Sequence, residues 1–532
     1  PVSAGVPVDV PGQGVRAVLE RQAARLGRRP FMVLPDASLT YSDADEVANR
    51  GAGVLAQLGV GTGDTVMAYC GNGLPMVATW LACMKLGAVF MPVNTLLSGG
   101  PLRHVMGHSG AAVLVCDATL HPHVEAIGEG LPDLRTVLVS GKPAPRALSF
   151  EASLEETPPV PPPPLADDPG APAKLVYTSG TTGSSKGVVW SRACEVTWAH
   201  CYNEELLELG QDEATYCCLP LYHVTCQGTA LATMVAGARI TVDDRFRPFT
   251  FWERVRRAEA QAFTFVGTIL SVLARLPPEP DDADNPVRRI LGSAAPADRW
   301  REIERRFDLE VVDVWGQTET ASCWTRPVQL PQRPGTVGRP SPRFEARIVG
   351  ESGEELGPEA QGELWIRPLR PHVMFEGYRA DDGCVVAPWT EDGWYRTGDL
   401  MVRRADGDLV FVGRLRDAIR RRGEMICAAD VETAALAHPG VLEAAAVGVP
   451  ADEGVEEEIK LCAVPQPGAA LEPGAFHSFL RHRLPAFMVP RFIDVRDDLP
   501  KTATTRVQKY RLREEGVTGA WDARRPRSSA GG

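Results

Sequence analysis

Short apolar runs alternate with helical stretches along the first half of this 532-residue chain, and this alternation constrains the fold more than any other feature. The runs "PFMVLP", "DTVMAYC" and "AVFMPV" have the composition of strands, and "PMVATWLACMKLG" has the apolar spacing of a helix. Thr40, Tyr41 and Ser42 form a capping start to an earlier helix. Strands that alternate with helices predict an α/β fold with a largely parallel sheet.

The predicted pattern of secondary structure changes twice after this region. Beyond about residue 330, short strands and turns such as "ARIVGESGEELGPEAQGELWIRP" predict a small β-rich subdomain. From Gly413 onward, "AADVETAALAHPG", "VLEAAAVGVP" and "IKLCAVPQ" predict a compact α+β domain. We therefore expect a large N-terminal domain of mixed α/β sheets with the β-rich subdomain at 1–412, a small C-terminal α+β domain at 413–520, and a disordered tail at 521–532.

Composition and charge exclude several classes of function. The net charge is -12, and no segment has the concentrated excess of Lys and Arg that a nucleic-acid partner requires. No apolar run reaches the roughly 18 residues of a membrane span, and the first residues lack a leader pattern. We therefore expect a cytoplasmic protein with no membrane partner. The 12 cysteines are scattered without zinc spacing, which predicts reduced structural thiols.

The stretch "YTSGTTGSSKGVV", from Tyr177 to Val189, is too rich in small residues to build a core. It follows an apolar strand and presents backbone amides, hydroxyls and the Lys186 ammonium, which together suit phosphate oxygens. Its spacing does not match G-x-x-x-x-G-K-[ST], so a Walker-type site is not expected. A flexible linker is the alternative, although linkers seldom lie between two strand-like runs.

This run resembles the signature of the adenylate-forming superfamily, which includes acyl-CoA synthetases, luciferases and nonribosomal peptide adenylation domains. Ser185 departs from the signature, which usually has proline there. Four further stretches resemble family motifs in the same order: "GSAAP" (292–296), "VWGQTET" (314–320), "YRTGD" (395–399) and "GRLRDAIRRRGE" (413–424). In texture the chain is most similar to bacterial carnitine-CoA-ligase-like acyl-CoA ligases.

The resemblance implies a nucleotide site that binds ATP with Mg²⁺. The loop would close on the β- and γ-phosphates, Trp315 would stack on adenine, and Asp399 would bind the ribose hydroxyls. Thr318 and Glu319 would contact Mg²⁺, which prefers hard oxygen ligands. The implied nucleotide-binding residues are Thr178, Ser179, Gly180, Thr181, Thr182, Gly183, Lys186, Gly292, Ser293, Ala294, Ala295, Trp315, Gly316, Gln317, Thr318, Asp399 and Arg414.

The resemblance also implies the acid pocket and the moving parts. His223 would stand at the mouth of the pocket, although a histidine on an apolar segment is more often a core residue. The implied pocket residues are His223, Val224, Thr225, Cys226, Gln227 and Gly267, and the implied catalytic residues are Lys186, Glu319, Arg414, His223 and Arg506. Family members rotate the small C-terminal domain about a hinge, which corresponds here to Arg416.

One motif departs from the family pattern. The adenylation lysine usually follows a glycine near the C-terminus, but here Thr505 and Arg506 occupy these two positions. An arginine keeps the charge, but its guanidinium is wider and planar. Lys501 and Lys509 flank the site and are alternative sources of an ammonium.

Three functions stay open from the sequence. The first is ATP-dependent activation of a carboxylic acid as an acyl-adenylate, with CoA as the acceptor. The second is activation of nitrite as an AMP anhydride that diazotises an aryl amine. The third is a non-catalytic nucleotide-binding homologue. The pocket segments contain no arginine or lysine, which favours a monocarboxylic or aromatic acid over a dicarboxylic one.

Overall fold

A computed structural model describes residues 14–128, 131–142, 144–178, 185–327, 330–421, 424–450, 457–501 and 507–524. The chain divides into two compact units, which are described separately below. The first unit contains residues 1–346 and 366–395, and the second contains residues 347–365 and 396–532. The prediction placed this boundary at 412/413. Residues 396–412 fall in the second unit because β21 (Tyr395–Arg403) pairs with β22 (Leu409–Arg414).

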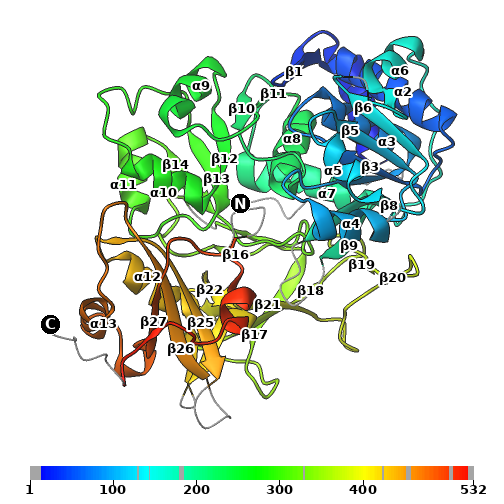
Figure 1. Cartoon of the computed structure of the whole chain (residues 1–532). Helices are drawn as coiled ribbons and strands as arrows, with labels where there is room; N and C mark the ends of the chain where they lie inside the picture. The colour runs from blue at the N-terminus through cyan, green and yellow to red at the C-terminus, as the bar shows by residue number, and fades with distance from the viewer. Residues whose placement is uncertain are drawn as a thin grey trace. The chain divides into compact units, whose positions relative to one another are not determined.

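A nine-stranded sheet forms one half of the first unit (Figure 1). Its strands lie in the order β20 (Val385–Val386), β19 (Gly377–Arg379), β9 (Lys186–Ser191), β8 (Pro172–Thr178), β4 (Val89–Pro92), β3 (Thr65–Tyr69), β5 (Val113–Asp117), β6 (Thr136–Ser140) and β7 (Leu148–Ser149). The strands from β8 to β7 pair in parallel, whereas β8–β9, β9–β19 and β19–β20 are antiparallel. The expected alternation is confirmed here, because β3, α3 (Leu74–Leu86) and β4 follow one another.

A seven-stranded sheet forms the other half of this unit. Its order is β14 (Glu310–Asp313), β13 (Arg289–Ser293), β12 (Ala262–Val266), β10 (Ala214–Cys217), β11 (Arg239–Val242), β1 (Pro30–Val33) and β2 (Ser38–Thr40). Only the β1–β2 pair at one edge is antiparallel. The carboxyl ends of β12, β13 and β14 therefore lie at the same edge, where parallel α/β sheets commonly bind ligands.

Helices pack against both sheets of the first unit. α3 and α7 (Arg192–Tyr202) contact the nine-stranded sheet, α8 (Val224–Ala236) contacts the seven-stranded sheet, and α7 packs on α8. α2 (Tyr41–Gln57) begins at the predicted place, with Thr40 and Asp43 forming a reciprocal capping box. The remaining helices are α1 (Val15–Leu26), α4 (Gly99–His108), α5 (His121–Glu125), α6 (Phe150–Glu156), α9 (Phe251–Arg257), α10 (Gly267–Arg275) and α11 (Trp300–Phe307). A small ladder joins β15 (Thr325–Arg326) to β16 (Arg339–Pro340).

The second unit contains the predicted α+β arrangement. Its main sheet has the order β25 (Val441–Pro450), β26 (Glu457–Pro465), β27 (Phe492–Val495) and β28 (Trp521–Asp522). Its helices are α12 (Ala428–Leu436), α13 (Pro473–Arg481) and α14 (Lys509–Glu514), and β23 (Ala418–Arg421) pairs with β24 (Glu424–Cys427). Another sheet has the order β17 (Phe344–Val349), β18 (Gln361–Pro368), β21 and β22, and the division between the units passes through it.

The prediction of a tail that starts at residue 521 is wrong for its first residues. Trp521 and Asp522 pair with β27, and the Asp522 carboxylate accepts hydrogen bonds from Arg491 at 3.1 Å. The apolar indole and this ion pair hold the segment on the sheet edge. Residues 525–532 lie outside the described part of the chain.

The described cysteines and helices give two further observations. Eleven cysteines have described side chains; these are unpaired, and all of them except Cys384 are buried. No described helix combines the length and the apolar composition that crossing a bilayer requires.

Candidate active site

The two ends of the glycine- and hydroxyl-rich loop are fixed by strand pairing. β8 ends at Thr178 and β9 begins at Lys186, and these two residues are partners in the antiparallel register. Ser179, Gly180, Thr181, Thr182 and Gly183 lie outside the described residues. The strand pairing therefore places the predicted loop between two adjacent strands of the nine-stranded sheet.

Two histidines of α4 contact the residues that flank this loop. The Nε2 of His104 lies 3.0 Å from the Ser185 carbonyl oxygen, and Nδ1 of His108 lies 2.6 Å from the Tyr177 hydroxyl. Burial and the neighbouring His104 lower the pKa of His108, so its ring is neutral near neutral pH. The sequence analysis missed this pair, although H-x-x-x-H spacing on a helix places both rings on one face.

Tyr378 of β19 connects two of the predicted catalytic side chains. Its ring lies under the Lys186 ammonium, with Nζ 4.9 Å from the ring centroid, and its hydroxyl donates to Oε1 of Glu319 at 3.1 Å. Burial and the Glu319 carboxylate raise the pKa of Tyr378, so the hydroxyl remains a donor. Sequence reasoning missed Tyr378, because only the strand register brings it beside Lys186.

The turn that carries Thr318 and Glu319 is held by its backbone. The Nε1 of Trp190 donates to the Thr318 carbonyl at 2.8 Å, and the backbone N–H of Phe375 donates to the Glu319 carbonyl at 3.0 Å. Trp315, predicted to stack on adenine, is only 5% exposed, and it is the following Gly316 that is exposed. The exposed surface of this turn is therefore the Gly316 backbone and not the Trp315 ring, and the turn's contacts orient the Glu319 carboxylate.

The predicted nucleotide-binding residues 292–295, called the adenine wall below, lie at the carboxyl end of β13, beside the carboxyl end of its neighbour β12. A Cβ on Gly267 would approach the Ala294 carbonyl oxygen to 2.1 Å, so only glycine fits at this crossing. Ala294 has a left-handed φ of 64° and is exposed, as is Ser293, whose hydroxyl donates to the Val314 carbonyl at 2.8 Å. Gly267 therefore packs closely against the predicted adenine wall, in addition to its predicted place in the acid pocket.

Asp313, the last residue of β14, holds the same segment by a hydrogen bond. It is 4% exposed, and its Oδ2 accepts a hydrogen bond from the Ala295 backbone N–H at 3.0 Å. Burial raises the pKa of Asp313 to about 7. The folded protein therefore keeps a proton on this carboxyl over a pH range in which the unfolded chain has released it.

We expect Asp313→Asn to stabilise the protein increasingly as the pH rises. The contribution of protonated Asp313 is complete below the unfolded pKa of about 4 and is lost as the pH rises through about 7. The neutral amide avoids this loss, so the free energy of unfolding of the variant should gain on the wild type by up to about 1.4 kcal/mol per pH unit in this window. Urea denaturation at pH 5, 6, 7 and 8 measures the difference. A difference that does not change with pH would contradict the assignment.

The segment before α8, which leads into the predicted pocket residues from His223 onward, is held by Asn72. Asn72 Nδ2 donates to the carbonyl oxygens of Leu219 (2.9 Å) and Asp243 (2.7 Å), and its Oδ1 accepts from the Leu221 N–H at 2.7 Å. Gln227 Nε2 donates to the Leu221 carbonyl at 2.7 Å. These bonds fix the backbone two residues before the exposed His223.

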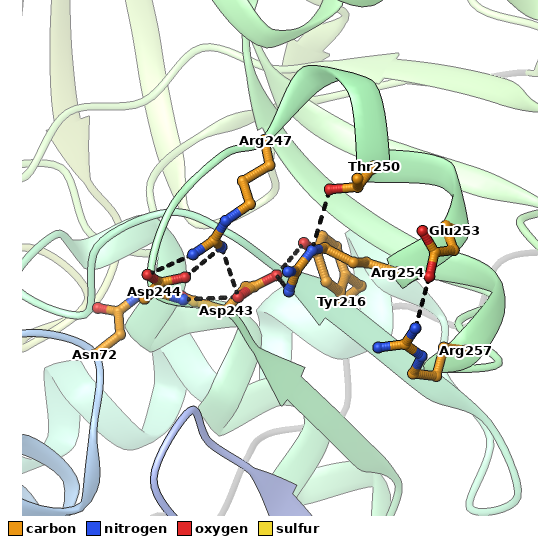
Figure 2. Close-up of polar contacts among 9 residues, drawn as sticks. All are labelled: Asn72, Tyr216, Asp243, Asp244, Arg247, Thr250, Glu253, Arg254 and Arg257. Carbon is orange, nitrogen blue, oxygen red and sulfur yellow. Dashed lines mark hydrogen bonds and ion pairs between the residues drawn. The ribbon is translucent and has the colours of Figure 1, made fainter.

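Asp243 is itself fixed by a polar cluster (Figure 2). Its carboxylate accepts from the Tyr216 hydroxyl at 2.9 Å and from Arg254 at 2.8 Å, and Arg247 bridges it to Asp244. Arg247, Thr250 and Arg254 are brought here by the turn into α9. The carbonyl that Asn72 binds therefore belongs to a residue that cannot easily move.

Val224, Thr225, Cys226 and Gln227 form the first turn of α8. Val224 and Thr225 are partly exposed, whereas Cys226 and Gln227 are completely buried. The partly exposed pair can face a ligand directly, and the buried pair supports the helix from inside.

The second unit contains the predicted ribose residues. Asp399 and Arg414 are partners on β21 and β22, and Arg414 Nη1 lies 2.8 Å from Oδ1 of Asp399. Asp399 is 1% exposed, and the Thr397 hydroxyl accepts from its backbone N–H at 3.1 Å. Burial lowers the pKa of Arg416 to about 10, and the Arg416 carbonyl accepts a hydrogen bond from Arg513 at 2.7 Å. Arg506 lies outside the described residues.

The metal ligands available to the site are few. Within the described chain, no group of three or more His, Cys, Asp or Glu side chains could hold a metal ion. One oriented carboxylate, Glu319, and the adjacent Thr318 suit a magnesium ion that takes its other ligands from phosphates and water. The donor set therefore fits Mg²⁺ that arrives with a nucleotide.

Comparison with protein families gives two matches. The AMP-binding enzyme model matches residues 19–379, and the AMP-binding enzyme C-terminal domain model matches residues 430–506. The first of these covers more than half of the chain. The resemblance inferred from the sequence motifs is confirmed.

Curated relatives match over almost the whole chain. Sulfoacetate–CoA ligase of Cupriavidus necator is 31% identical over 93% of this chain and 96% of its own length. Indoleacetate–CoA ligase of Aromatoleum aromaticum is 29% identical, with 93% and 97% covered. Crotonobetaine/carnitine–CoA ligase of Salmonella paratyphi A is 26% identical, with 95% and 99% covered.

Solved structures confirm the fold. The anthranilate CoA ligase AuaEII, in complex with anthranoyl-AMP, aligns with a TM-score of 0.83 at 22% identity, covering 95% of this chain and 97% of that one. ATP-bound MatB from Rhodopseudomonas palustris aligns with a TM-score of 0.81 at 24% identity, covering 94% and 99%. The predicted fold class, a mixed α/β N-terminal part with a smaller C-terminal part, is the fold of these structures.

Proposed function

The chain belongs to the AMP-binding enzyme family, and from this premise we propose that it is an ATP-dependent, AMP-forming acid–CoA ligase. The observation that carries the proposal is the grouping of Lys186, Tyr378 and Glu319 beside the loop between β8 and β9. In this grouping Tyr378 contacts the Lys186 ammonium through its ring and the Glu319 carboxylate through its hydroxyl. The curated relatives named above are all CoA ligases and match over 96%, 97% and 99% of their own length, which supports the reaction class.

The reaction has two steps with separate bond changes. A carboxylate oxygen attacks the α-phosphorus of ATP, forming a P–O bond while the bond to the leaving pyrophosphate breaks. The CoA thiolate then attacks the acyl carbon, forming a C–S bond and releasing AMP. Lys186 would stabilise the developing phosphate charge, and Thr318 and Glu319 would hold Mg²⁺, which would supply neutralisation of phosphate charge. In the second unit, Asp399 binds the ribose hydroxyls and is oriented by Arg414.

Arg506 supplies the C-terminal cation of the adenylation step in this proposal. The two flanking lysines are already engaged inside the second unit. Lys501 Nζ lies 2.8 Å from Glu443 and 2.9 Å from Asp498, and Lys509 Nζ lies 2.7 Å from the largely buried Glu432. Removing either lysine from its carboxylates would leave those charges unpaired, which favours Arg506. Rotation of the C-terminal domain about Arg416 would bring this residue into use.

The acid is a small-molecule carboxylate, and we propose a monocarboxylic or aromatic one. The segments "LYHVTCQGTAL", "FVGTIL" and "GSAAP" contain no arginine or lysine to pair with a second anionic group. The relatives are named for a sulfonated, an indolyl and a quaternary-ammonium acid, so the substrate panel must span these three classes.

The test is pyrophosphate release from ATP and Mg²⁺ with the acid panel, with and without CoA. Acid-dependent release followed by CoA thioester formation supports the proposal. Release only with nitrite and an aryl amine would replace it with the diazotising reaction, and ATP binding without release would replace it with a non-catalytic role. Arg506→Lys should retain release and Arg506→Ala should lose it, whereas Lys501→Met and Lys509→Met should keep most of it.

We expect Asn72→Asp to raise the KM for the acid by about tenfold and to leave the KM for MgATP unchanged. The substitution removes both N–H donors and sets a carboxylate against two carbonyl oxygens, and each lost bond contributes about 1 kcal/mol. Steady-state kinetics on the best acid of the panel measures the effect. Arg257→Gln, which removes an exposed pair with Glu253 near the same cluster, is the control and should change neither constant. A change in the MgATP constant instead would contradict the role.

A further inference from the structure

A charged cluster is enclosed by tryptophans in the first unit, away from solvent. Lys174 of β8 and Glu195 of α7 form an ion pair with Nζ 2.7 Å from Oε1, and their side chains are 0% and 4% exposed. Nζ also lies 5.4, 5.1 and 5.3 Å from the ring centroids of Trp80, Trp190 and Trp198. We call these five residues the tryptophan cage.

The cage is not what a stable core requires. Burying two charges removes their hydration, and well-packed apolar residues of similar volume often serve stability equally well. Cation–π contacts compensate part of this loss. The tryptophan cage does fix the orientations of its side chains, because the Lys174 ammonium must stay near three indole rings and beside the Glu195 carboxylate. The main structural effect of the tryptophan cage is therefore to fix the orientation of the three indole rings.

The strand register connects the cage to the candidate active site. In the β8–β9 ladder Lys174 faces Trp190, four pairs before Thr178 faces Lys186. Side chains two and four residues apart share one face of a strand, so Trp190 and Lys186 point to the same side of β9, roughly 13 Å apart along the strand. Tyr378 faces Val188 between them, on the same side.

Trp190 is the member of the cage that reaches the site. It is completely buried, its ring stands edge-on to Trp198 with centroids 4.8 Å apart, and its N–H donates to the Thr318 carbonyl at 2.8 Å. Thr318 precedes Glu319, whose carboxylate accepts from Tyr378. One strand thus carries Lys186 at its start and the support of the Thr318–Glu319 turn near its end.

We propose that Trp190 is a positioning residue of the nucleotide site, held by the Lys174–Glu195 pair so that its indole N–H fixes the Thr318–Glu319 turn relative to Lys186. This inference rests on the proposed function, since it assigns that turn to Mg²⁺ and the phosphates of ATP. Loss of the N–H leaves the turn free to shift, so magnesium-dependent binding of ATP weakens while contacts to the acid are unaffected.

The cage itself offers a matched control. Trp80 contributes an indole to the same ammonium, and its Nε1 is buried and makes no hydrogen bond within the described residues. Trp190→Phe and Trp80→Phe therefore remove similar ring area from one cluster, but only the first removes a bond to the turn. Calorimetric titration with ATP, with Mg²⁺ and with EDTA, separates the two effects without requiring turnover.

We expect Trp190→Phe to weaken MgATP binding by about tenfold, to weaken ATP binding in EDTA by less than threefold, and to leave the KM for the acid unchanged; Trp80→Phe should stay within twofold in all three. Equal effects of the two substitutions, or an effect of Trp190→Phe on the acid alone, would overturn the inference. If Trp190→Phe does not fold, β-(3-benzothienyl)alanine at position 190 keeps the ring shape without the N–H and should give the same tenfold loss.

The two proposals fail in different ways. If the unsubstituted chain binds no MgATP, the proposed function falls and this inference falls with it. If the unsubstituted chain binds MgATP and the Trp190 and Trp80 variants are indistinguishable, only the positioning role falls.

Discussion

Lys174→Met is expected to destabilise the protein by about 3–5 kcal/mol, because it leaves the Glu195 carboxylate buried without its partner. The methionine fills most of the volume of the lysine side chain, so a cavity contributes little to this loss. The measurement is the free energy of unfolding from urea denaturation at neutral pH. An effect of this size is large beside the free energy of unfolding of a typical protein, which is about 5–15 kcal/mol.

The double variant Lys174→Met/Glu195→Leu distinguishes charge from packing. It removes both charges and should recover most of the lost stability, since apolar replacements of a buried pair are often neutral or stabilising. If the double variant is as unstable as Lys174→Met, packing against the three indoles, rather than the unpaired carboxylate, is responsible. Exposed pairs such as Arg257–Glu253 should contribute less than about 1 kcal/mol in the same assay.

Glu319→Gln is expected to lower kcat for pyrophosphate release by about 10²–10³-fold, the range seen when one oriented electrostatic group is removed from an active site. The amide keeps an oxygen that can accept from the Tyr378 hydroxyl, so the shape of the turn is preserved while the charge proposed to hold Mg²⁺ is lost. Pyrophosphate release at saturating ATP, measured over a series of Mg²⁺ concentrations, tests the prediction.

Glu376→Gln is the matched control for this variant. Glu376 lies two residues before Tyr378 in the sequence, but its carboxylate pairs with His372, with Oε1 2.8 Å from Nδ1. Its substitution should leave kcat within a factor of about two. If both glutamine variants lose activity equally, the loss reflects the general charge of this region, and Glu319 has no special role.

The local elements could be predicted from the sequence, but their pairing could not. The strand–helix–strand run from β3 to β4 and the cap at Thr40 are readable because periodicity and capping involve residues close in the chain. The register that sets Lys174 opposite Trp190 joins two strands across the loop, and no local pattern specifies it. Lys174 therefore looked like an ordinary residue of an apolar strand.

The same distinction holds for the candidate site. Lys186, Thr318 and Glu319 could be named because they lie in contiguous motifs with a known family pattern. Tyr378 and Asn72 could not, since each acts through contacts with distant segments: Glu319 lies 59 residues from Tyr378, and Leu219 lies 147 residues from Asn72. The predicted boundary at 412/413 differs from the division into compact units for a related reason. The prediction followed the family motifs, whereas the β21–β22 pairing places residues 396–412 in the second unit.

The clamp made by Asn72 has a consequence for enzyme engineering. Because the backbone at Leu219 and Leu221 is anchored by the side chains of Asn72 and the buried Gln227, the predicted pocket side chains of Val224 and Thr225 contribute little to the local fold. Val224 and Thr225, which are partly exposed, can then be randomised together while the anchor stays in place. A library at these two positions should consist mostly of folded proteins, so that a screen of it would sample acid preference and not solubility.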